Sequence, residues 1–557
     1  MIWGVLMNLK VFAILLGCVL LQSCFHPVFA EDESSAKAWV IHQTEWSAQD
    51  EINFQNFVAQ IGAAIEARQC RTVTQCLDSS INPFRKSDPA GLLYHSDCAD
   101  FPYFLRGYFA WKNGLPFSFA NEMDYRDVPG NQGSDIRYSR YGNKVVKRFS
   151  VVATNGVFKN ALDIFNKFIP DQTSSANFRT HYADSQTDVY PVSVNRNSVR
   201  VGTVVYDPSG HVVLIYRVTD DGKALYIDAH PDNSVSSGVF GSKFLRSNPG
   251  HGSGFHDWRP QKLVGAQQTI SGAFINGRIV LAANAEIADY STEQYFGNTG
   301  QILSDADWSR GKFVLNGRDL NFYEFVRAKL AKGDLKIDPL KEFAALIGEI
   351  CVSLKDRVSA VDEAVKSGMD RRAHPDRLPP NIYGASGDWE DYSTPGRDAQ
   401  LKLTFNDLIQ ETASYIRRWK DGDANLIYQG ANLKADLLQV YGDQAMACRI
   451  SYTNSAGASV GLNLEEIRQR LFKLSFDPYH CVERRWGALN ASELSSCTDD
   501  QDKSLWYAAE QRLRNQHLRQ FDQKMDVPRE DLMNPQLGIG QAQPPDVDII
   551  GFLSAPN

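Results

Sequence analysis

The sequence predicts an α+β fold in which strands dominate one part of the chain and helices another. Apolar, β-branched runs at 201–206, 211–218 and 224–229 are separated by Asp-Pro-Ser-Gly and Asp-Gly, which are typical of strands joined by turns. From about residue 335 the apolar residues recur with the 3.6-residue period of helices, as between Leu340 and Val365. We therefore expect an antiparallel sheet followed by a mainly helical region.

Composition and charge exclude several classes of protein. Of 557 residues, 43% are hydrophobic and 22% are charged, which is typical of globular proteins. The formal net charge of −8 provides no basic surface for nucleic acid, so we expect no nucleic-acid partner. No phosphate-binding glycine motif or dinucleotide fingerprint occurs, and His251 and His256 lack a third ligand of suitable spacing. We therefore expect no cofactor and no metal.

The first thirty residues are typical of a secretory signal peptide. Lys10 is followed by an apolar run from Val11 to Leu21, and we place cleavage after Ala30. The apolar run is too short to span a membrane, so we expect no membrane span in the mature chain. Alternatively, the segment ending at Cys24 resembles a bacterial lipoprotein processing site, which would leave a lipid anchor on that cysteine. Both alternatives indicate a secreted or periplasmic protein.

The cysteines indicate disulfides and one unpaired thiol. Nine cysteines less Cys18 and Cys24 of the signal segment leave an odd number, seven, so at least one lacks an intramolecular partner. Exported proteins usually pair their cysteines. Sequence spacing and helical context favour the pairs Cys70–Cys76, Cys481–Cys497 and Cys351–Cys448. Cys98 is then the cysteine without a partner.

Cys98 and His211 are candidates for nucleophilic catalysis. Cys98 directly precedes an aromatic segment with helical spacing, and a helix N-terminus stabilises a thiolate and offers N–H groups to an oxyanion. His211 opens a strand after a turn, where its imidazole can take the thiol proton. The alternatives are a buried structural cysteine and an exposed turn histidine.

The next strand offers three side chains that can orient the histidine: Asp228, His230 and Asp232. With a tight Asp221-Gly222 turn, Asp232 faces His211 and Asp228 faces Ile215. An ideal ladder therefore favours His230 or Asp232. A bulge or sheet shear would instead bring Asp228 to His211. The residue that orients His211 therefore stays open between these three at this point.

Three short segments carry a resemblance to a known family. Ser96-Asp97-Cys98-Ala99, Gly210-His211-Val212 and Tyr226-Ile227-Asp228-Ala229 resemble the NlpC-type cell-wall cysteine peptidases of the papain-like group. The resemblance implies a papain-like core of an N-terminal helix and an antiparallel sheet. It also implies Cys98 as nucleophile, His211 as base and Asp228 as the orienting residue. Asp97 would match the acidic residue before the nucleophile and Tyr94 an upstream tyrosine near the oxyanion site, so we expect both to contribute to substrate or oxyanion binding.

The resemblance covers roughly residues 85–260 and departs from the family in three ways. Ala99-Asp100 replaces Ser-Gly, the stretch between Cys98 and His211 is unusually long, and the third residue is Asp where many members have His. We expect an exported cysteine peptidase or amidase that acts through a thioester, with peptidoglycan peptide as substrate. A non-enzymatic envelope binding or scaffold protein on the same fold, and an acyltransferase with the same triad, are the alternatives.

These observations divide the chain into four parts. A signal peptide (1–30) precedes a papain-like hydrolase domain (31–330) with a polar insertion (121–200), which could cover the site as a lid. A helical domain (331–527) and an extended tail (528–557) follow. The expected helices of the third part are 340–365, 398–420, 431–446, 463–474 and 503–525.

Overall fold

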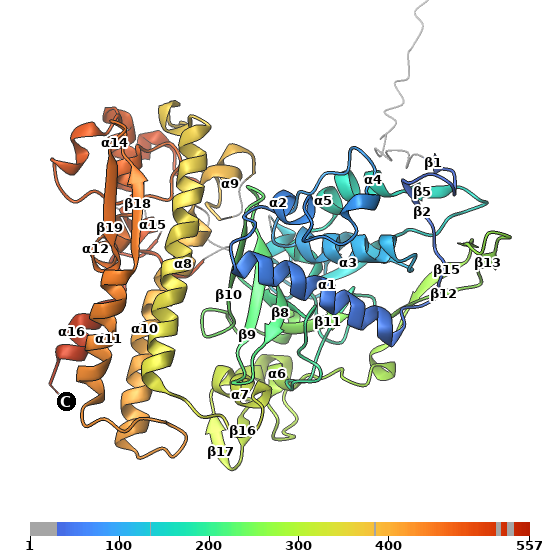
Figure 1. Cartoon of the computed structure of the whole chain (residues 1–557), viewed down its shortest axis with the longest axis horizontal. Coiled ribbons are helices and arrows are strands. Elements are labelled where there is room, and N and C mark those ends of the chain that lie inside the picture. Colours follow the sequence, from blue (N-terminus) through green and yellow to red (C-terminus); the bar gives the residue numbers. More distant parts are fainter. Residues whose placement is uncertain (1–29, 134, 384–385, 520–524, 532–539, 557) are drawn as a thin grey trace, which may run out of the picture.

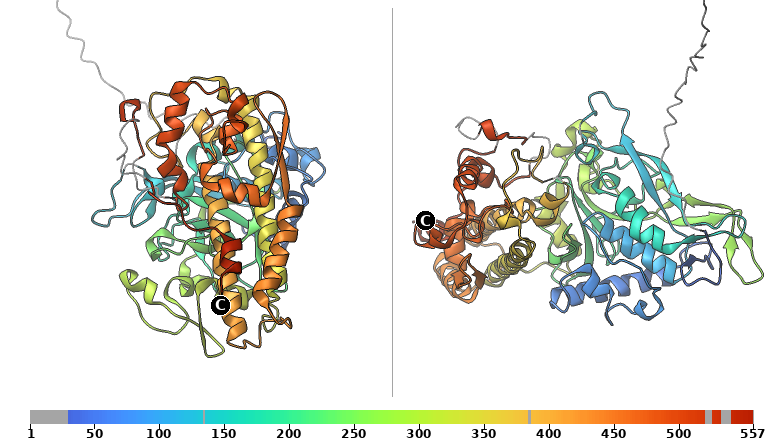
Figure 2. Two further views of the ribbon diagram at one scale, coloured as in Figure 1. Left: turned by 90° about the vertical axis from the view of Figure 1, so that its left-hand side faces the viewer. Right: turned by 90° about the horizontal axis from the view of Figure 1, so that it is seen from above.

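The computed structural model describes residues 30–133, 135–383, 386–519, 525–531 and 540–556. Two lobes lie side by side in them: an N-terminal lobe (30–330) of mixed helix and strand, and a mainly helical C-terminal lobe (335–556) (Figure 1). The view from above shows the same division (Figure 2, right). The expected signal segment, with Cys18 and Cys24, lies outside the described residues apart from Ala30. Across those described ranges, every helix is too short or too polar to cross a membrane.

The N-terminal lobe is built on a six-stranded sheet in which all neighbouring strands are antiparallel. The spatial order of its strands is β10-β9-β8-β7-β11-β6. The three strand runs expected from the sequence are β7, β8 and β9. The strands are β6 (Val189–Pro191), β7 (Val204–Asp207), β8 (His211–Val218), β9 (Ala224–Ala229), β10 (Val235–Val239) and β11 (Gly254–Trp258).

Both faces of this sheet are covered, because apolar residues occupy both sides of its central strands. Helices α1 (Ala48–Glu66) and α3 (Asp100–Lys112) pack on one face, and α7 (Phe322–Leu330) packs on the other. Helix α1 approaches β8 so closely that a Cβ atom on Gly62 would lie 2.2 Å from the ring of Tyr216. The start of α3 lies near the start of β8, where the backbone N–H of Val212 faces the Cys98 thiol.

Residues 121–200 are part of the lobe's core, so the prediction of a separate polar insertion is wrong. Phe165 and Ile169 from this range are fully buried in the main core, and β6 is a strand of the sheet. Irregularly spaced aromatic residues provide this burial, which explains why no periodic pattern marked it. The range contains most of the hairpin β3 (Ser118–Tyr125)–β4 (Asn143–Ser150), then β5 (Phe158–Asn160), α4 (Ala161–Asp163), a π-helical turn (Ile164–Phe168) and α5 (Ile169–Gln172).

Short elements complete the N-terminal lobe. Two of them, β16 and β17, form a hairpin just before α7. The elements are β1 (Ala30–Glu31), β2 (Ala38–Trp39), α2 (Val73–Leu77), β12 (Gln261–Val264), β13 (Gln267–Gln268), β14 (Phe274–Ile275), β15 (Arg278–Leu281), α6 (Glu293–Phe296), β16 (Phe313–Leu315) and β17 (Arg318–Leu320).

The C-terminal lobe packs its helices around a second core and also holds a hairpin, β18–β19, that the sequence analysis missed. The expected helix 503–525 is correct only in its first half, because α14 ends at Ala509, α15 ends at Asn515 and residues 516–519 are not helical. The expected extended tail is wrong in part, since Ile549 and Leu553 of α16 are buried in this core. The elements are α8 (Pro339–Lys366), α9 (Asp388–Tyr392), α10 (Pro395–Lys420), α11 (Leu433–Ala447), β18 (Arg449–Thr453), β19 (Ser459–Asn463), α12 (Leu464–Arg470), α13 (Val482–Arg485), α14 (Gln501–Ala509), α15 (Gln511–Asn515) and α16 (Ile549–Ser554).

Disulfides join the cysteines in the pairs that the spacing favoured. They are Cys70–Cys76, Cys351–Cys448 and Cys481–Cys497. Cys98 is the free cysteine of the described chain. Disulfides are compatible with an extracellular or periplasmic protein.

Candidate active site

A cavity of about 230 Å³ between the two lobes contains the residues that the sequence analysis singled out. Cys98, His211 and Asp228 all line it, together with Asp97 and His230. They come from three places that are far apart in the sequence: the start of α3, the start of β8 and the end of β9. The fold therefore brings the candidate nucleophile, base and orienting acid to one site.

Cys98 lies just before α3, and its neighbour Asp97 caps that helix. The Asp97 carboxylate accepts hydrogen bonds from the backbone N–H groups of Ala99 (2.8 Å) and Asp100 (2.9 Å). These two donors are therefore engaged and do not face an oxyanion. Among the described residues, no acceptor binds the backbone N–H of Cys98 itself, which leaves that group for an oxyanion. Asp97 thus has a capping role, in place of the oxyanion role considered for it.

The surroundings of Cys98 favour the neutral thiol. Burial, followed by the nearby Asp97 carboxylate, raises the pKa of the thiol above its ordinary value, and Asp228 acts in the same direction. The backbone N–H of Val212 and the charge of Arg519 act in the opposite direction but do not compensate. The expectation that the start of α3 favours a Cys98 thiolate therefore has the wrong direction, since burial and the Asp97 carboxylate favour the thiol.

The raised pKa predicts how Cys98 responds to alkylation. Since only the thiolate reacts, the iodoacetamide rate at Cys98 should keep rising above pH 9, whereas glutathione as a reference thiol levels off sooner. The rate is measured by mass spectrometry of the peptide that contains Cys98. A Cys98 rate that is already maximal at pH 7 would contradict this assignment of the thiol.

His211 and Asp228 form a direct hydrogen bond. The distance from His211 Nε2 to Asp228 Oδ2 is 2.7 Å, and the Asp228 side chain is only 4% exposed. Burial alone would raise the pKa of Asp228, but neighbouring His230 and the hydrogen bonds from His211 and Ser236 hold it below its ordinary value. The ionised carboxylate accepts the Nε2 hydrogen, which leaves Nδ1 of neutral His211 as a proton acceptor.

The register of β8 and β9 explains why Asp228 reaches His211. Leu214 pairs with Ile227, so the continued ladder places Asp228 beside Val213, two residues closer to His211 than expected. One residue of this shift comes from a bulge between Ile215 and Arg217. The other comes from the turn, in which the Thr219 N–H binds the Lys223 carbonyl. The prediction of an ideal ladder is therefore wrong, and the bulge that was the alternative is present.

The other two candidates for the residue that orients His211 make different contacts. His230 Nε2 lies 3.2 Å from Ser236 Oγ and 3.8 Å from Asp228 Oδ2, and its ring centroid is 6.3 Å from that of His211. Burial and the charge of Arg397 lower the pKa of His230 to about 4, so this ring is neutral near pH 7. Asp232 instead pairs with Arg397 at 2.9 Å. Of the three candidates, which all lie within the described residues, only Asp228 forms a hydrogen bond with His211.

Tyr94 is not among the residues that line the cavity. Its hydroxyl donates to Asp88, and its ring packs against Phe104 at a centroid distance of 6.3 Å. The suggested position near an oxyanion is therefore wrong. No hydrogen bond joins the Cys98 thiol to His211 in the described chain, although both side chains line the same cavity. Contacts of this kind are often longer before a substrate binds.

The contact between His211 and Asp228 predicts unequal effects for two substitutions. Asp228→Asn should lower kcat/KM for amide hydrolysis by about 10²- to 10⁴-fold, because the amide no longer fixes the ring tautomer or stabilises the imidazolium. His230→Gln is the matched control and should keep most of the activity. Steady-state kinetics on both variants tests this, and a larger loss in His230→Gln than in Asp228→Asn would assign the orienting role to His230 instead.

The C-terminal lobe forms the opposite wall of the cavity, which the sequence analysis did not foresee. Trp389, Asp391, Arg397 and Arg519 line it from that side. Ion pairs such as Arg397–Asp232 connect the lobes next to the cavity. Residues 137–138 and 174–175 also line the site, so the expected lid segment contributes only part of its cover. The aromatic, acidic stretch Asp388–Tyr392 was the one local signal for this wall.

No family model matches the chain in comparisons with known proteins, and neither a curated protein nor a solved structure matches it. Function is therefore inferred from the residues and the geometry of the cavity.

Proposed function

We propose that the chain is a cysteine hydrolase that cleaves an amide bond through a thioester on Cys98, with a short peptide of the cell wall as substrate. The observation that carries the proposal is the hydrogen bond between His211 and Asp228 in the same cavity as the free thiol. An unpaired thiol, an imidazole with one nitrogen left as acceptor, and a buried carboxylate are the parts of nucleophilic catalysis by cysteine.

In the proposed first half-reaction, His211 Nδ1 takes the thiol proton as Cys98 Sγ attacks the carbonyl carbon of the amide. The negative charge that develops on the carbonyl oxygen faces the Cys98 backbone N–H. The imidazolium, stabilised by Asp228, then gives its proton to the leaving nitrogen as the C–N bond breaks. The products are a free amine and a thioester on Cys98.

In the second half-reaction, His211 takes a proton from water, and the hydroxide formed attacks the thioester carbonyl. The C–S bond breaks, the acid leaves, and the proton returns to the sulfur. The raised pKa of the Cys98 thiol fits this order of events, because the proton leaves only as the attack occurs. Acyl transfer would differ only in that an amine replaces the water.

The charges around the cavity support a short peptide with charged ends as substrate. Asp97 and Asp391 contribute negative charge to its lining, whereas Arg137 and Arg519 contribute positive charge. Charges of both signs suit a ligand that carries both free carboxylates and an amine, as cell-wall stem peptides do. The cavity volume of about 230 Å³ is just below the usual range for pockets that hold a small molecule, which favours a short peptide as the ligand.

The experiment is a digestion of peptidoglycan fragments and of casein by the purified protein, followed by mass spectrometry of the products. We expect cleavage of the fragments at an amide bond, with a new carboxylic acid and a new amine. A product with a new amide bond would identify an acyltransferase. If no amide substrate reacts and Cys98→Ala supports full biological function, the proposal is wrong and a non-enzymatic envelope protein is favoured.

A further inference from the structure

A second cluster of chemically active side chains lies inside the C-terminal lobe, away from the proposed active site. His374, Asp477, His480 and Glu510 converge there, and none of their side chains is more than 1% exposed. His374 Nε2 lies 2.7 Å from Asp477 Oδ2. His480 Nε2 lies 3.9 Å from the same oxygen and 3.5 Å from Glu510 Oε2. Ligand atoms of His374, Asp477 and Glu510 all fall within 4.8 Å of one another.

An acceptor oxygen at Nδ1, on the side away from the cluster, orients each of the two imidazole rings. His374 Nδ1 lies 2.7 Å from the Pro375 carbonyl oxygen, and His480 Nδ1 lies 3.1 Å from Asp499 Oδ2. Because these oxygens only accept hydrogen bonds, each Nδ1 carries a hydrogen and each Nε2 faces the cluster, where a bound cation would take the place of its proton. A histidine that binds a metal is oriented in the same way by a carbonyl or carboxylate.

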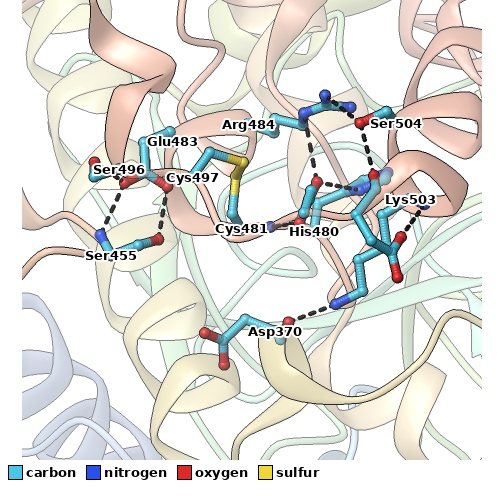
Figure 3. The surroundings of a disulfide bond; sticks show 12 residues. Asp370, Ser455, His480, Cys481, Glu483, Arg484, Ser496, Cys497, Lys503 and Ser504 are labelled. Carbon is cyan, nitrogen blue, oxygen red and sulfur yellow. Dashed lines mark hydrogen bonds and ion pairs between the residues drawn. A yellow bond between two sulfur atoms is a disulfide. The ribbon is translucent and has the colours of Figure 1, made fainter.

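The disulfide Cys481–Cys497 holds this arrangement in place. Figure 3 shows that His480 lies directly beside it. Asp499, which orients His480, accepts a hydrogen bond of 2.7 Å from the backbone N–H of Cys481. The cross-link therefore fixes both the ring and its orienting carboxylate.

Several atoms of the cluster have no hydrogen-bond partner within the described chain. They are His480 Nε2 and both carboxylate oxygens of Glu510, all fully buried. Arg514 lies 3.7 Å from Glu510, but it donates to the Tyr507 carbonyl at 2.6 Å and to Gln511 at 3.0 Å. Buried polar atoms without partners are costly and uncommon in native proteins.

Protons and a bound cation are alternative ways to satisfy this cluster. A second proton on His374 satisfies Asp477 at 2.7 Å, whereas His480 Nε2 lies 3.5 Å from Glu510 Oε2, at the long limit of a hydrogen bond. One divalent cation among the ligand atoms of His374, Asp477 and Glu510 would also lie close to His480 Nε2. Atoms that bind zinc at about 2.0–2.2 Å are roughly 3–3.5 Å from each other, close to the spacing of His480 and Glu510.

We propose that His374, His480, Asp477 and Glu510 bind a divalent transition metal, with zinc as the ion that this donor set fits best. Imidazole nitrogen and carboxylate oxygen are both zinc ligands, and four protein ligands form a closed, structural site. The ion would connect the segment before α9, the loop before α13 and the junction of α14 and α15. This site was not expected from the sequence, because its residues have no motif spacing. It is independent of the proposed hydrolase activity.

The test is metal analysis of the protein purified from zinc-supplemented medium and dialysed against a chelator. We expect about one zinc per chain by mass spectrometry of the dissolved metal. X-ray absorption at the zinc edge should show nitrogen and oxygen ligands without sulfur, which excludes a site at Cys98. His480→Gln and Glu510→Gln should lose the metal, whereas His42→Gln, an exposed control, should keep it.

Three results would overturn the metal site. The first is a wild-type protein that holds no metal and whose thermal unfolding is unchanged by added zinc. The second is zinc bound through sulfur. The third is a full equivalent of zinc in the folded His480→Gln and Glu510→Gln proteins. Should those variants not fold, the metal content and absorption spectrum of the wild type decide alone.

Discussion

Cys98→Ala is expected to lower amide hydrolysis by about 10³-fold or more. The substitution removes the atom that forms the thioester, so that only substrate binding and the oxyanion donor remain. The measurement is kcat/KM on the peptidoglycan fragment that the wild type cleaves. Because Cys98 forms no disulfide, its replacement does not remove a cross-link.

Two controls separate chemistry from folding. Thermal unfolding of Cys98→Ala should match that of the wild type, since the side chain loses a single sulfur atom at the edge of the cavity. Cys98→Ser should also be nearly inactive, because a hydroxyl is a much weaker nucleophile than a thiol in this setting. A Cys98→Ala protein that retains wild-type turnover would rule out the thioester route.

Asp398→Ala is expected to destabilise the C-terminal lobe by about 3–5 kcal/mol. Arg357 Nε donates to Asp398 Oδ1 at 2.7 Å, Arg357 Nη2 lies 3.1 Å from Oδ2, and both side chains are 1% exposed. Loss of one partner of a buried pair leaves the other charge without compensation, which accounts for the size of the effect. Calorimetry of the unfolding transition measures it.

Glu363→Ala is the matched control on the same lobe. Glu363 pairs with Lys366 at 3.6 Å, and both side chains are more than half exposed. Exposed ion pairs contribute little to stability, so the expected change in the free energy of unfolding is within about 1 kcal/mol. If Asp398→Ala shifted the transition no more than this control, the buried pair would not support the lobe as described.

Local patterns predicted much of the sheet and most of the long helices. β-branched runs between turn residues locate β7, β8 and β9, and the 3.6-residue period locates α8, α10 and α11. The odd number of cysteines, together with the spacing that favoured three pairs, identified Cys98 as the free thiol. Each of these signals lies within a short stretch of sequence, or in a simple count, and needs no tertiary information.

Features that depend on contacts between distant segments escaped the sequence analysis. The position of Asp228 depends on a bulge after Ile215, which no residue pattern announces. The pKa of Cys98 depends on burial and on Asp97, so the helix dipole alone predicted the wrong direction. The cavity wall around Arg397 comes from the C-terminal lobe, some three hundred residues after Cys98. Cys98 and His211 could therefore be predicted as candidates from the sequence, but their environment could not.

The proposed thioester can be observed directly. The wild type is mixed with the cleaved peptidoglycan fragment, quenched in acid within the first turnover and analysed by mass spectrometry of the intact protein and of its peptides. We expect a mass increase equal to the acyl part of the substrate on the peptide that contains Cys98, removable by hydroxylamine and absent from Cys98→Ala. Substrate cleavage with no adduct on Cys98, or the same adduct in Cys98→Ala, would contradict Cys98 as the nucleophile.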